Sequence, residues 1–164
     1  MPEKKLLIVD YDRNSLESLV SLFKPYEFKI LTATDGQTAY ELFQREQPNC
    51  VILEAMLPKL HGFDLCQRIY EESKGDVPVV IVTGLYKGPQ YRKEALRSFG
   101  ASAYFEKPYD RNKLVATVLD LIQEEMEIQE DLPSPEKVTV LLDELFDKVK
   151  TEENKGGGLL VWSN

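Results

Sequence analysis

Short apolar runs alternate with amphipathic stretches along most of this chain, and this alternation constrains the fold more than any other feature. Each run is a predicted strand, and the apolar residues of the following stretch recur every three or four positions, as in a helix. Five such rounds predict a parallel α/β sheet with helices on both faces. The expected strands are 6–9, 28–33, 50–53, 78–82 and 103–105, and the expected helices are 13–23, a segment between Asp35 and Pro48, 63–70, 91–99 and 113–126.

Four of the predicted strands end in a polar side chain, which locates a candidate site. These side chains are Asp10, Glu54, Thr83 and Lys107. The carboxyl ends of parallel strands lie along one edge of a sheet, where open α/β sheets bind ligands and carry out chemistry. The sequence therefore predicts that the four side chains share one crevice.

The pattern changes after the fifth round. Residues 125–134 are a predicted linker, and residues 135–150 are a predicted amphipathic helix with an apolar stripe that must be buried against something. Residues 151–164 combine a Gly-rich hinge with an apolar tail. We expect this C-terminal part to be a docking arm or the start of a further, truncated domain, with a dimerisation helix as a third alternative.

Charge is spread unevenly along the chain, which has a formal net charge of −8. Residues 1–123 carry 16 basic and 17 acidic side chains, whereas residues 124–164 carry 4 and 11. Phosphate contacts need a basic surface, so the acidic part disfavours a nucleic-acid partner. Since no apolar run approaches the ~20 residues that span a bilayer, we also expect no membrane association. Cys50 and Cys66 lie in predicted core positions, which is typical of reduced cysteines in a cytoplasmic protein.

Five motifs follow one another in a fixed order over residues 4 to 124. They are Val9-Asp10-Tyr11, the stretch Glu54-Ala55-Met56-Leu57-Pro58-Lys59-Leu60-His61-Gly62, then Thr83, Tyr104 and Lys107-Pro108. In this order they resemble a response-regulator receiver domain of two-component signalling. The resemblance covers residues 4 to about 124, and we expect a receiver-like domain over residues 1–124. It implies the flavodoxin-like fold, a doubly wound five-stranded parallel sheet of order 2-1-3-4-5 with five helices.

The resemblance also implies a role for each motif. Glu54 occupies the phosphoacceptor position, and Asp10 and Tyr11 occupy the acidic pocket. Thr83 and Tyr104 are the switch pair, in which the threonine moves toward the acid site and the aromatic ring follows it inward. Lys107 senses the phosphate, and the bond to Pro108 is often cis in the family. His61 is the only histidine, and we expect no catalytic or ligand role for it.

Two of these positions depart from the family pattern. The acceptor is normally aspartate, and the second acid normally ligates Mg²⁺, but Glu54 and Tyr11 stand there. Asp12 is expected to be a surface acid or helix cap. Mg²⁺ prefers several oxygen ligands in octahedral geometry. We therefore expect weakened Mg²⁺ binding, through Asp10 and Glu54 if at all, and no other cofactor.

Glutamate is one methylene longer than aspartate, a difference of about 1.5 Å. Lys107 is then expected to pair with Glu54 directly, and the Thr83 hydroxyl to donate a hydrogen bond to it. One interpretation is that Glu54 partly mimics an aspartyl phosphate. The other is that Glu54 and Lys107 form a structural ion pair in a retired site. For Thr83 and Tyr104, a surviving switch and a purely structural role stay equally open.

The leading interpretation is a phosphorelay module that acts through protein–protein interaction, is not phosphorylated and is not an enzyme. Its expected partners are a histidine kinase or a downstream effector, with homodimers through the face of the fourth helix, fifth strand and fifth helix, or through the C-terminal helix, as alternatives. The runner-up is a phosphorylatable, Mg²⁺-dependent response regulator. A flavodoxin-like FMN protein is third, because the acidic segment from Asp10 to Asp12 would repel the FMN phosphate.

Overall fold

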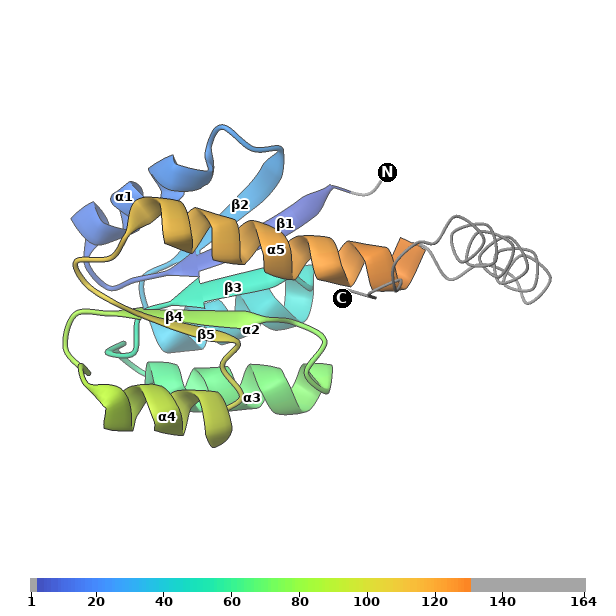
Figure 1. Cartoon of the computed structure of the whole chain (residues 1–164). Coiled ribbons are helices and arrows are strands. Elements are labelled where there is room, and N and C mark those ends of the chain that lie inside the picture. The colour runs from blue at the N-terminus through green and yellow to red at the C-terminus, as the bar shows by residue number, and fades with distance from the viewer. Residues whose placement is uncertain (1–2, 131–164) are drawn as a thin grey trace, which may run out of the picture. The chain divides into compact units, whose positions relative to one another are not determined.

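The computed structural model describes residues 3–130 and contains a five-stranded parallel sheet in the order β2-β1-β3-β4-β5 (Figure 1). This order and the alternation of strands and helices confirm the predicted fold class. The strands are β1 (Lys4–Val9), β2 (Phe28–Ala33), β3 (Cys50–Leu53), β4 (Val79–Thr83) and β5 (Ala103–Glu106). The helices are α1 (Arg13–Phe23), α2 (Gly36–Glu46), α3 (Gly62–Ser73), α4 (Pro89–Arg97) and α5 (Arg111–Glu130).

Helices cover both faces of the sheet, with α1 and α5 on one side and α2, α3 and α4 on the other (Figure 1). Successive residues of a strand point to opposite faces. In β1, Leu6 and Ile8 therefore pack in the core under α1 and α5, while Leu7 and Val9 pack in the core on the other face. Because both faces are covered, β3 and β4 are buried throughout, which explains why their sequences are apolar apart from Thr83 at the end of β4.

The strand register brings the carboxyl ends of β1, β3, β4 and β5 to the same edge. Val9 is paired with Leu53, and the Glu54 N–H donates to the Val9 carbonyl over 2.9 Å. At the other end of the site, the Lys107 N–H donates to the Thr83 carbonyl over 2.8 Å. The four strands therefore end side by side at one edge of the sheet. The residues that follow them lie close together there and form the candidate site.

Helix boundaries differ by a few residues from the sequence-based expectation. Asp12 and Asp35 cap α1 and α2. Asp12 accepts from the N–H groups of Asn14 and Ser15, and Asp35 accepts from the Thr38 N–H. The α4 helix begins at Pro89, since proline suits the first turn of a helix. The α5 helix reaches Glu130 and so extends into the segment expected as a linker, 125–134. The predicted helix 135–150 and tail 151–164 lie outside the described residues.

Residues 1–126 and 127–164 form two separate units. Within the first unit, both cysteines are buried as predicted, Cys50 in β3 and Cys66 in α3. Burial raises the pKa of the Cys66 thiol to about 12, so this thiol stays protonated and unreactive at neutral pH. Over residues 3–130, none of the helices has the length and apolar character needed to cross a bilayer.

Gly62, the first residue of α3, has no room for a side chain. A Cβ atom there would lie 2.3 Å from the Glu54 carbonyl oxygen and 2.7 Å from the Ala55 Cα. We expect Gly62→Ala to lower the free energy of unfolding by at least about 2 kcal/mol, because backbone must move to admit the methyl group. Urea unfolding followed by circular dichroism measures this loss.

Gly84→Ala is the matched control. A Cβ at Gly84 would meet only the flexible Lys107 side chain, at 3.5 Å, which is ordinary van der Waals contact. We expect a loss below about 1 kcal/mol for this variant. Equal losses in the two variants would contradict the close packing of α3 against the end of β3.

Candidate functional site

The ammonium group of Lys107 lies between two buried carboxylates. Its Nζ is 2.8 Å from Asp10 Oδ2 and 2.9 Å from Glu54 Oε2. Asp10 is fully buried and Glu54 is 2% exposed. The four strand ends thus come together as predicted, and Glu54 forms the expected ion pair with Lys107.

Main-chain N–H groups hold the two carboxylates in place. The Gly84 N–H donates to Glu54 Oε2 and the Met56 N–H donates to Glu54 Oε1, each over 3.3 Å. The Asp12 N–H donates to Asp10 Oδ1 over 3.0 Å. Each carboxylate therefore combines a charged partner with main-chain donors, which is how buried carboxylates avoid the cost of lost hydration.

Lys107 is half-buried, which by itself lowers its pKa, but the hydrogen bonds and charges of Asp10 and Glu54 more than offset this effect. The net result is a pKa above the ordinary value of 10.5. Lys107 is consequently protonated at neutral pH. Lys107 thus forms ion pairs with both Asp10 and Glu54 at the edge of the sheet.

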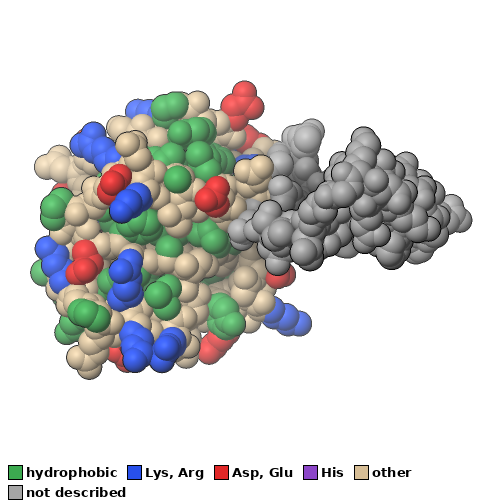
Figure 2. Space-filling model, viewed as in Figure 1, with side chains coloured by type: hydrophobic (Ala, Val, Ile, Leu, Met, Phe, Trp, Pro, Cys, Tyr) green, Lys and Arg blue, Asp and Glu red, His purple; other side chains and the backbone are tan. Residues whose placement is uncertain are grey.

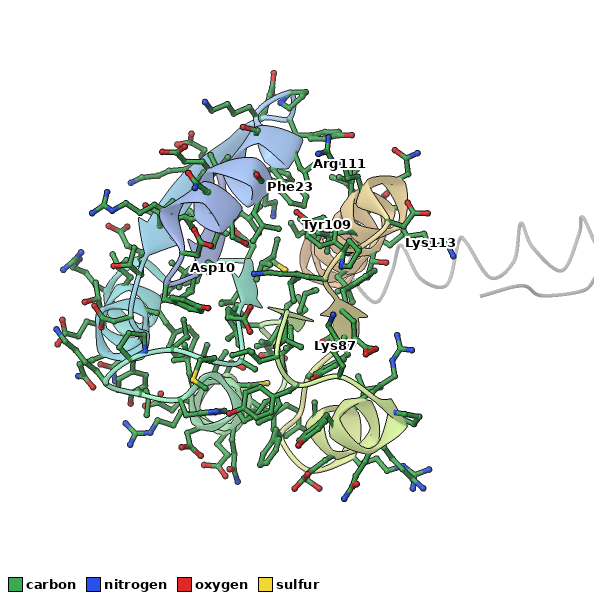
Figure 3. The ribbon with its side chains drawn as sticks, turned by 90° about the vertical axis from the view of Figure 1, so that its left-hand side faces the viewer. Asp10, Phe23, Lys87, Tyr109, Arg111 and Lys113 are labelled. Atoms are coloured by element: carbon green, nitrogen blue, oxygen red, sulfur yellow. The ribbon has the colours of Figure 1, made fainter. Side chains whose placement is uncertain are left out.

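Figure 3 looks onto the carboxyl ends of the strands and shows Asp10 at this edge, with Tyr109 and Lys87 across from it. Tyr109 follows β5 and Lys87 lies in the loop after β4. Tyr11, which the family resemblance places at the position of the second acid, is 49% exposed. The next residue, Asp12, caps α1 through Oδ1, which accepts from the N–H groups of Asn14 and Ser15. Its use as a cap agrees with the predicted role.

Thr83 is fully buried, and its hydroxyl organises the loop between β4 and α4. Its Oγ1 accepts from the N–H groups of Leu85 and Tyr86, both over 3.3 Å. We expected this hydroxyl to donate to Glu54. Within residues 3–130 the donor from this strand end is instead the N–H of Gly84, because the Thr83 side chain closes its own loop.

Tyr104 points inward and is 2% exposed. Its hydroxyl donates to the Tyr86 main-chain carbonyl, and its own carbonyl accepts from Arg92 Nη2 of α4 over 2.8 Å. Burial, with smaller effects of the charges on Glu106 and Glu54, raises the pKa of Tyr104 to about 12. The Lys107–Pro108 peptide bond is cis, as the family resemblance implies.

The donor set at this edge does not match the magnesium site that the resemblance implies. Mg²⁺ is usually held by carboxylates together with waters in octahedral geometry. Here both available carboxylates already contact the Lys107 ammonium, and Tyr11 brings no carboxylate. Nowhere in the described part of the chain do three or more His, Cys, Asp or Glu side chains gather as metal ligands would.

The model of the response regulator receiver domain family matches residues 6–119. The chain belongs to this family. The receiver domain is 35% identical over 124 residues to "Probable transcriptional regulator ycf27" of Cyanophora paradoxa, covering 74% of this chain and 49% of that protein. It is 28% identical over 120 residues to "Alkaline phosphatase synthesis transcriptional regulatory protein PhoP" of Bacillus subtilis, covering 73% and 49%. The chain thus spans about half the length of these curated relatives.

Solved structures agree on the fold. The signal receiver domain of an HD domain-containing protein from Pseudomonas fluorescens Pf-5 superimposes with a TM-score of 0.70 at 22% identity, covering 77% of this chain and 99% of that one. At this identity the likeness supports the architecture alone. It agrees with the strand order.

Sequence reasoning missed the groups at the site that act through their main chain. The N–H groups of Gly84 and Met56 contact Glu54. Every residue except proline has such a group, so the sequence does not show which ones will act as donors. It also missed Tyr86, whose carbonyl receives the Tyr104 hydroxyl. Its position, an aromatic residue three places after Thr83 in a loop, was the only available signal.

Lys107→Met tests the charge balance of the site. Removal of the ammonium leaves Asp10 and Glu54 buried with no cation between them, and we expect a loss of about 3–5 kcal/mol in the free energy of unfolding. Acidification should recover part of this loss, because protonation removes the repulsion between the carboxylates. Urea unfolding at neutral and mildly acidic pH measures both effects.

Glu54→Gln is the matched variant, since it keeps the shape of the side chain and leaves the Lys107–Asp10 pair intact. We expect it to cost less than about 2 kcal/mol, and to offset part of the Lys107→Met loss in the double variant. Strictly additive losses would show that the ion pair contributes nothing measurable.

The raised pKa of Tyr104 predicts a loss of stability at alkaline pH. The unfolded chain releases this proton near the ordinary pKa of 10.0, whereas the folded domain holds it up to about 12. Stability therefore falls as pH rises through this window. The raised pKa of Lys107 acts in the same direction, because its stabilising effect is present below 10.5 and lost as pH rises through its folded value.

Tyr104→Phe isolates the contribution of Tyr104. The variant lacks the hydroxyl and its hydrogen bond, so it should be less stable at neutral pH but should lose less stability between about pH 9 and about pH 11. The difference in the free energy of unfolding between the wild type and Tyr104→Phe should become smaller over this pH range. A constant difference would mean that Tyr104 is not buried in the native state.

Proposed function

We propose that this receiver domain is a phosphorelay signalling module that acts through protein–protein contacts and does not accept a phosphoryl group. Glu54 takes the place of the acceptor aspartate, and its charge contact with Lys107 stands in for the contact that an attached phosphate would make. In this proposal the domain turns over no substrate. Its output is the surface that it presents to a partner.

The contact between Glu54 and Lys107 carries this proposal. The glutamate Oε2 already lies 2.9 Å from the Lys107 ammonium and accepts from the Gly84 N–H. One oxygen of the would-be nucleophile is therefore engaged by Lys107, the residue that the family resemblance assigns to sensing the phosphate. A carboxylate carries about −1, against −1.5 to −2 for a phosphate, so the mimicry is partial.

The inward position of Tyr104 also supports a domain held in one state. In the switch that the resemblance implies, the aromatic ring moves inward when the acid site is occupied. Here the ring is buried and its hydroxyl is bonded to Tyr86, with Glu54 and Lys107 in contact. The arrangement fits the mimic interpretation better than a retired site with an outward tyrosine.

Weak metal binding belongs to the same proposal. With Tyr11 exposed and both carboxylates paired with Lys107, a divalent cation would have to displace the ammonium group. The donor set offers no compensation for that displacement. We propose that Mg²⁺ binds weakly, through Asp10 and Glu54 alone, and that no other cofactor is present.

A phosphorylatable, Mg²⁺-dependent response regulator is the second candidate. Asp10, Glu54, Thr83, Tyr104 and Lys107 all occupy the positions that a working receiver uses, which favours it. A glutamyl phosphate is also chemically feasible. An FMN protein with the same fold is disfavoured, because Asp10 and Asp12 bring negative charge to the loop after β1.

Partners are expected to be a histidine kinase or a downstream effector in a reducing compartment such as the cytoplasm, which suits two buried cysteines. The printed names of the curated relatives describe transcriptional regulators. Basic side chains gather over α4 at the lower edge of the view in Figure 2. The exposed Arg92, Lys93 and Arg97 of α4 suit an acidic partner, and the same face offers a route to a homodimer.

Exposure to acetyl phosphate and Mg²⁺ tests whether the domain accepts phosphate. Intact-mass spectrometry should show no phosphoryl adduct on the wild-type chain, because Glu54 is already paired and the metal site lacks one acid. Glu54→Asp combined with Tyr11→Asp restores both acids, and we expect this variant to gain a Mg²⁺-dependent adduct.

A phosphoryl adduct that maps to Glu54 in the wild-type chain would overturn the proposal in favour of the working receiver. The Glu54→Asp variant alone is the intermediate control. This variant has an aspartate acceptor but still lacks a carboxylate at position 11. We expect it to gain only a small amount of phosphoryl adduct, so the further gain in the double variant measures the effect of the second acid.

A further inference from the structure

Gly88, the N-cap of α4, has no side chain with which to cap the helix. The first N–H groups of a helix have no acceptor within the helix, and the next residue, Pro89, has no N–H at all. In a capping box, a glutamate at the third helical position accepts from the N–H of the N-cap residue. In α4 this position holds Tyr91. A side chain that caps α4 therefore has to come from another element.

Glu106 of β5 supplies this side chain. Its Oε1 accepts from the Gly88 N–H over 2.9 Å. The contact is the one that a glutamate makes in a capping box, but here it comes from a strand 18 residues further along the chain. The carboxylate also brings negative charge to the N-terminus of α4, where the helix dipole favours it.

Tyr104 holds the same turn from the same face of β5. Residues two apart in a strand point to the same side of the sheet, so Tyr104 and Glu106 lie side by side. The Tyr104 hydroxyl donates to the Tyr86 carbonyl, and the Glu106 carboxylate accepts from the Gly88 N–H. Arg92, one turn into α4, donates to the Tyr104 carbonyl over 2.8 Å. Two neighbouring side chains of β5 thus hold the turn from which α4 begins.

The other end of α4 is anchored by packing against α3, which lies beside it (Figure 1). The rings of Phe99 and Phe63 are stacked, with their centroids 5.2 Å apart. The Tyr70 ring lies against Gly100, where a Cβ atom would be 2.3 Å from the ring. Within α4 itself, which the structure describes in full, Ala95 is the only buried residue. The start of α4 therefore depends on the contacts from β5, whereas its end is fixed by α3.

We propose that Glu106 is the positioning residue of α4. Together with the inward Tyr104 it holds the start of the helix against β5, and loss of its contact releases the N-terminal half of α4 while the rest of the domain stays folded. The meaning for signalling rests on the proposed function, in which α4 carries basic side chains that a partner meets. An outward movement of Tyr104 removes its bond to Tyr86, so the state of the acid site reaches the partner surface through the start of α4.

Hydrogen exchange of the full chain, followed by NMR at neutral pH, tests this proposal. The Arg92 N–H donates to the Gly88 carbonyl and so reports on the first turn of α4. In Glu106→Ala the amides of Gly88 and Arg92 should exchange about fivefold faster, the scale of losing one helix cap. The amides of Leu65 and Ile69 in α3 should exchange at the wild-type rate, because Glu106 is exposed and its loss leaves the core intact.

Two further variants separate capping from a general change of charge. Glu106→Gln keeps an acceptor oxygen and removes the charge, so exchange at Arg92 should accelerate only about twofold. Glu94→Ala removes the same charge from α4 itself. Over residues 3–130 the exposed Glu94 side chain makes no hydrogen bond or ion pair, so this variant should leave exchange at Arg92 unchanged.

The Tyr104→Phe background tests whether Tyr104 and Glu106 hold the turn together. This background lacks the bond to Tyr86, so the start of α4 is already loosened. Adding Glu106→Ala should then accelerate exchange at Arg92 by about twofold instead of fivefold, because residues that share one network have non-additive effects. Equal effects in the two backgrounds would overturn the joint hold.

Two results with Glu106→Ala in the wild-type background would overturn the proposal. One is unchanged exchange at Arg92. The other is an equal acceleration at Arg92, Leu65 and Ile69, which would mean a loss of global stability and no local release of α4.

These outcomes are independent of the phosphorylation test. A phosphoryl adduct on Glu54 would overturn the proposed function and leave the capping of α4 by Glu106 standing. Unchanged exchange at the start of α4 would remove the positioning role of Glu106 and leave the unphosphorylated signalling module intact.

Discussion

The ammonium group of Lys107, shared between Asp10 and Glu54, is the contact on which the functional edge of the sheet depends. At an effective dielectric constant near 20, each contact of this length is worth roughly 6 kcal/mol of attraction. Removing each ion from water costs several kcal/mol as well, so the trio adds little net stability. The trio matters because the loss of any one member leaves a buried charge without its partner. The three residues are therefore constrained together, whatever the edge does in signalling.

The sheet explains why three residues so far apart in sequence meet at this point. Val9 pairs with Leu53, and the Lys107 N–H bonds to the Thr83 carbonyl, so neighbouring strands end level with one another. The apolar layers beneath α1 and α5 on one face, and beneath α2 to α4 on the other, hold this register in place. A shift of one residue in any central strand would turn buried side chains to the wrong face. The fold thus fixes the site before any ligand is considered.

Much of the fold and of the site could be predicted from the sequence, because residue types indicate where strands end and where helices have their apolar faces. The meeting of Asp10, Glu54 and Lys107 follows from parallel strands alone, and the strand order followed from the family resemblance. The finer contacts could not be read in this way. The Gly84 N–H replaced the Thr83 hydroxyl as donor to Glu54 because the path of a loop decides which group faces the acid, and loop paths depend on packing. The contact of Glu106 with the start of α4 required the same knowledge.

The structure separates the chemical part of a receiver from its mechanical part. The family resemblance implies altered chemistry at Glu54 and Tyr11, whereas Thr83, Tyr86 and Tyr104 form a continuous chain of hydrogen bonds through the loop after β4. Movement of one member of this chain would change the hydrogen bond that it makes to the next. In the ordinary family member such a movement follows the arrival of phosphate at the acid site. Here Lys107 contacts Asp10 and Glu54 at the acid site, and the Gly84 N–H that donates to Glu54 comes directly after Thr83. The ion contact and the hydrogen-bonded chain therefore meet at the end of β4.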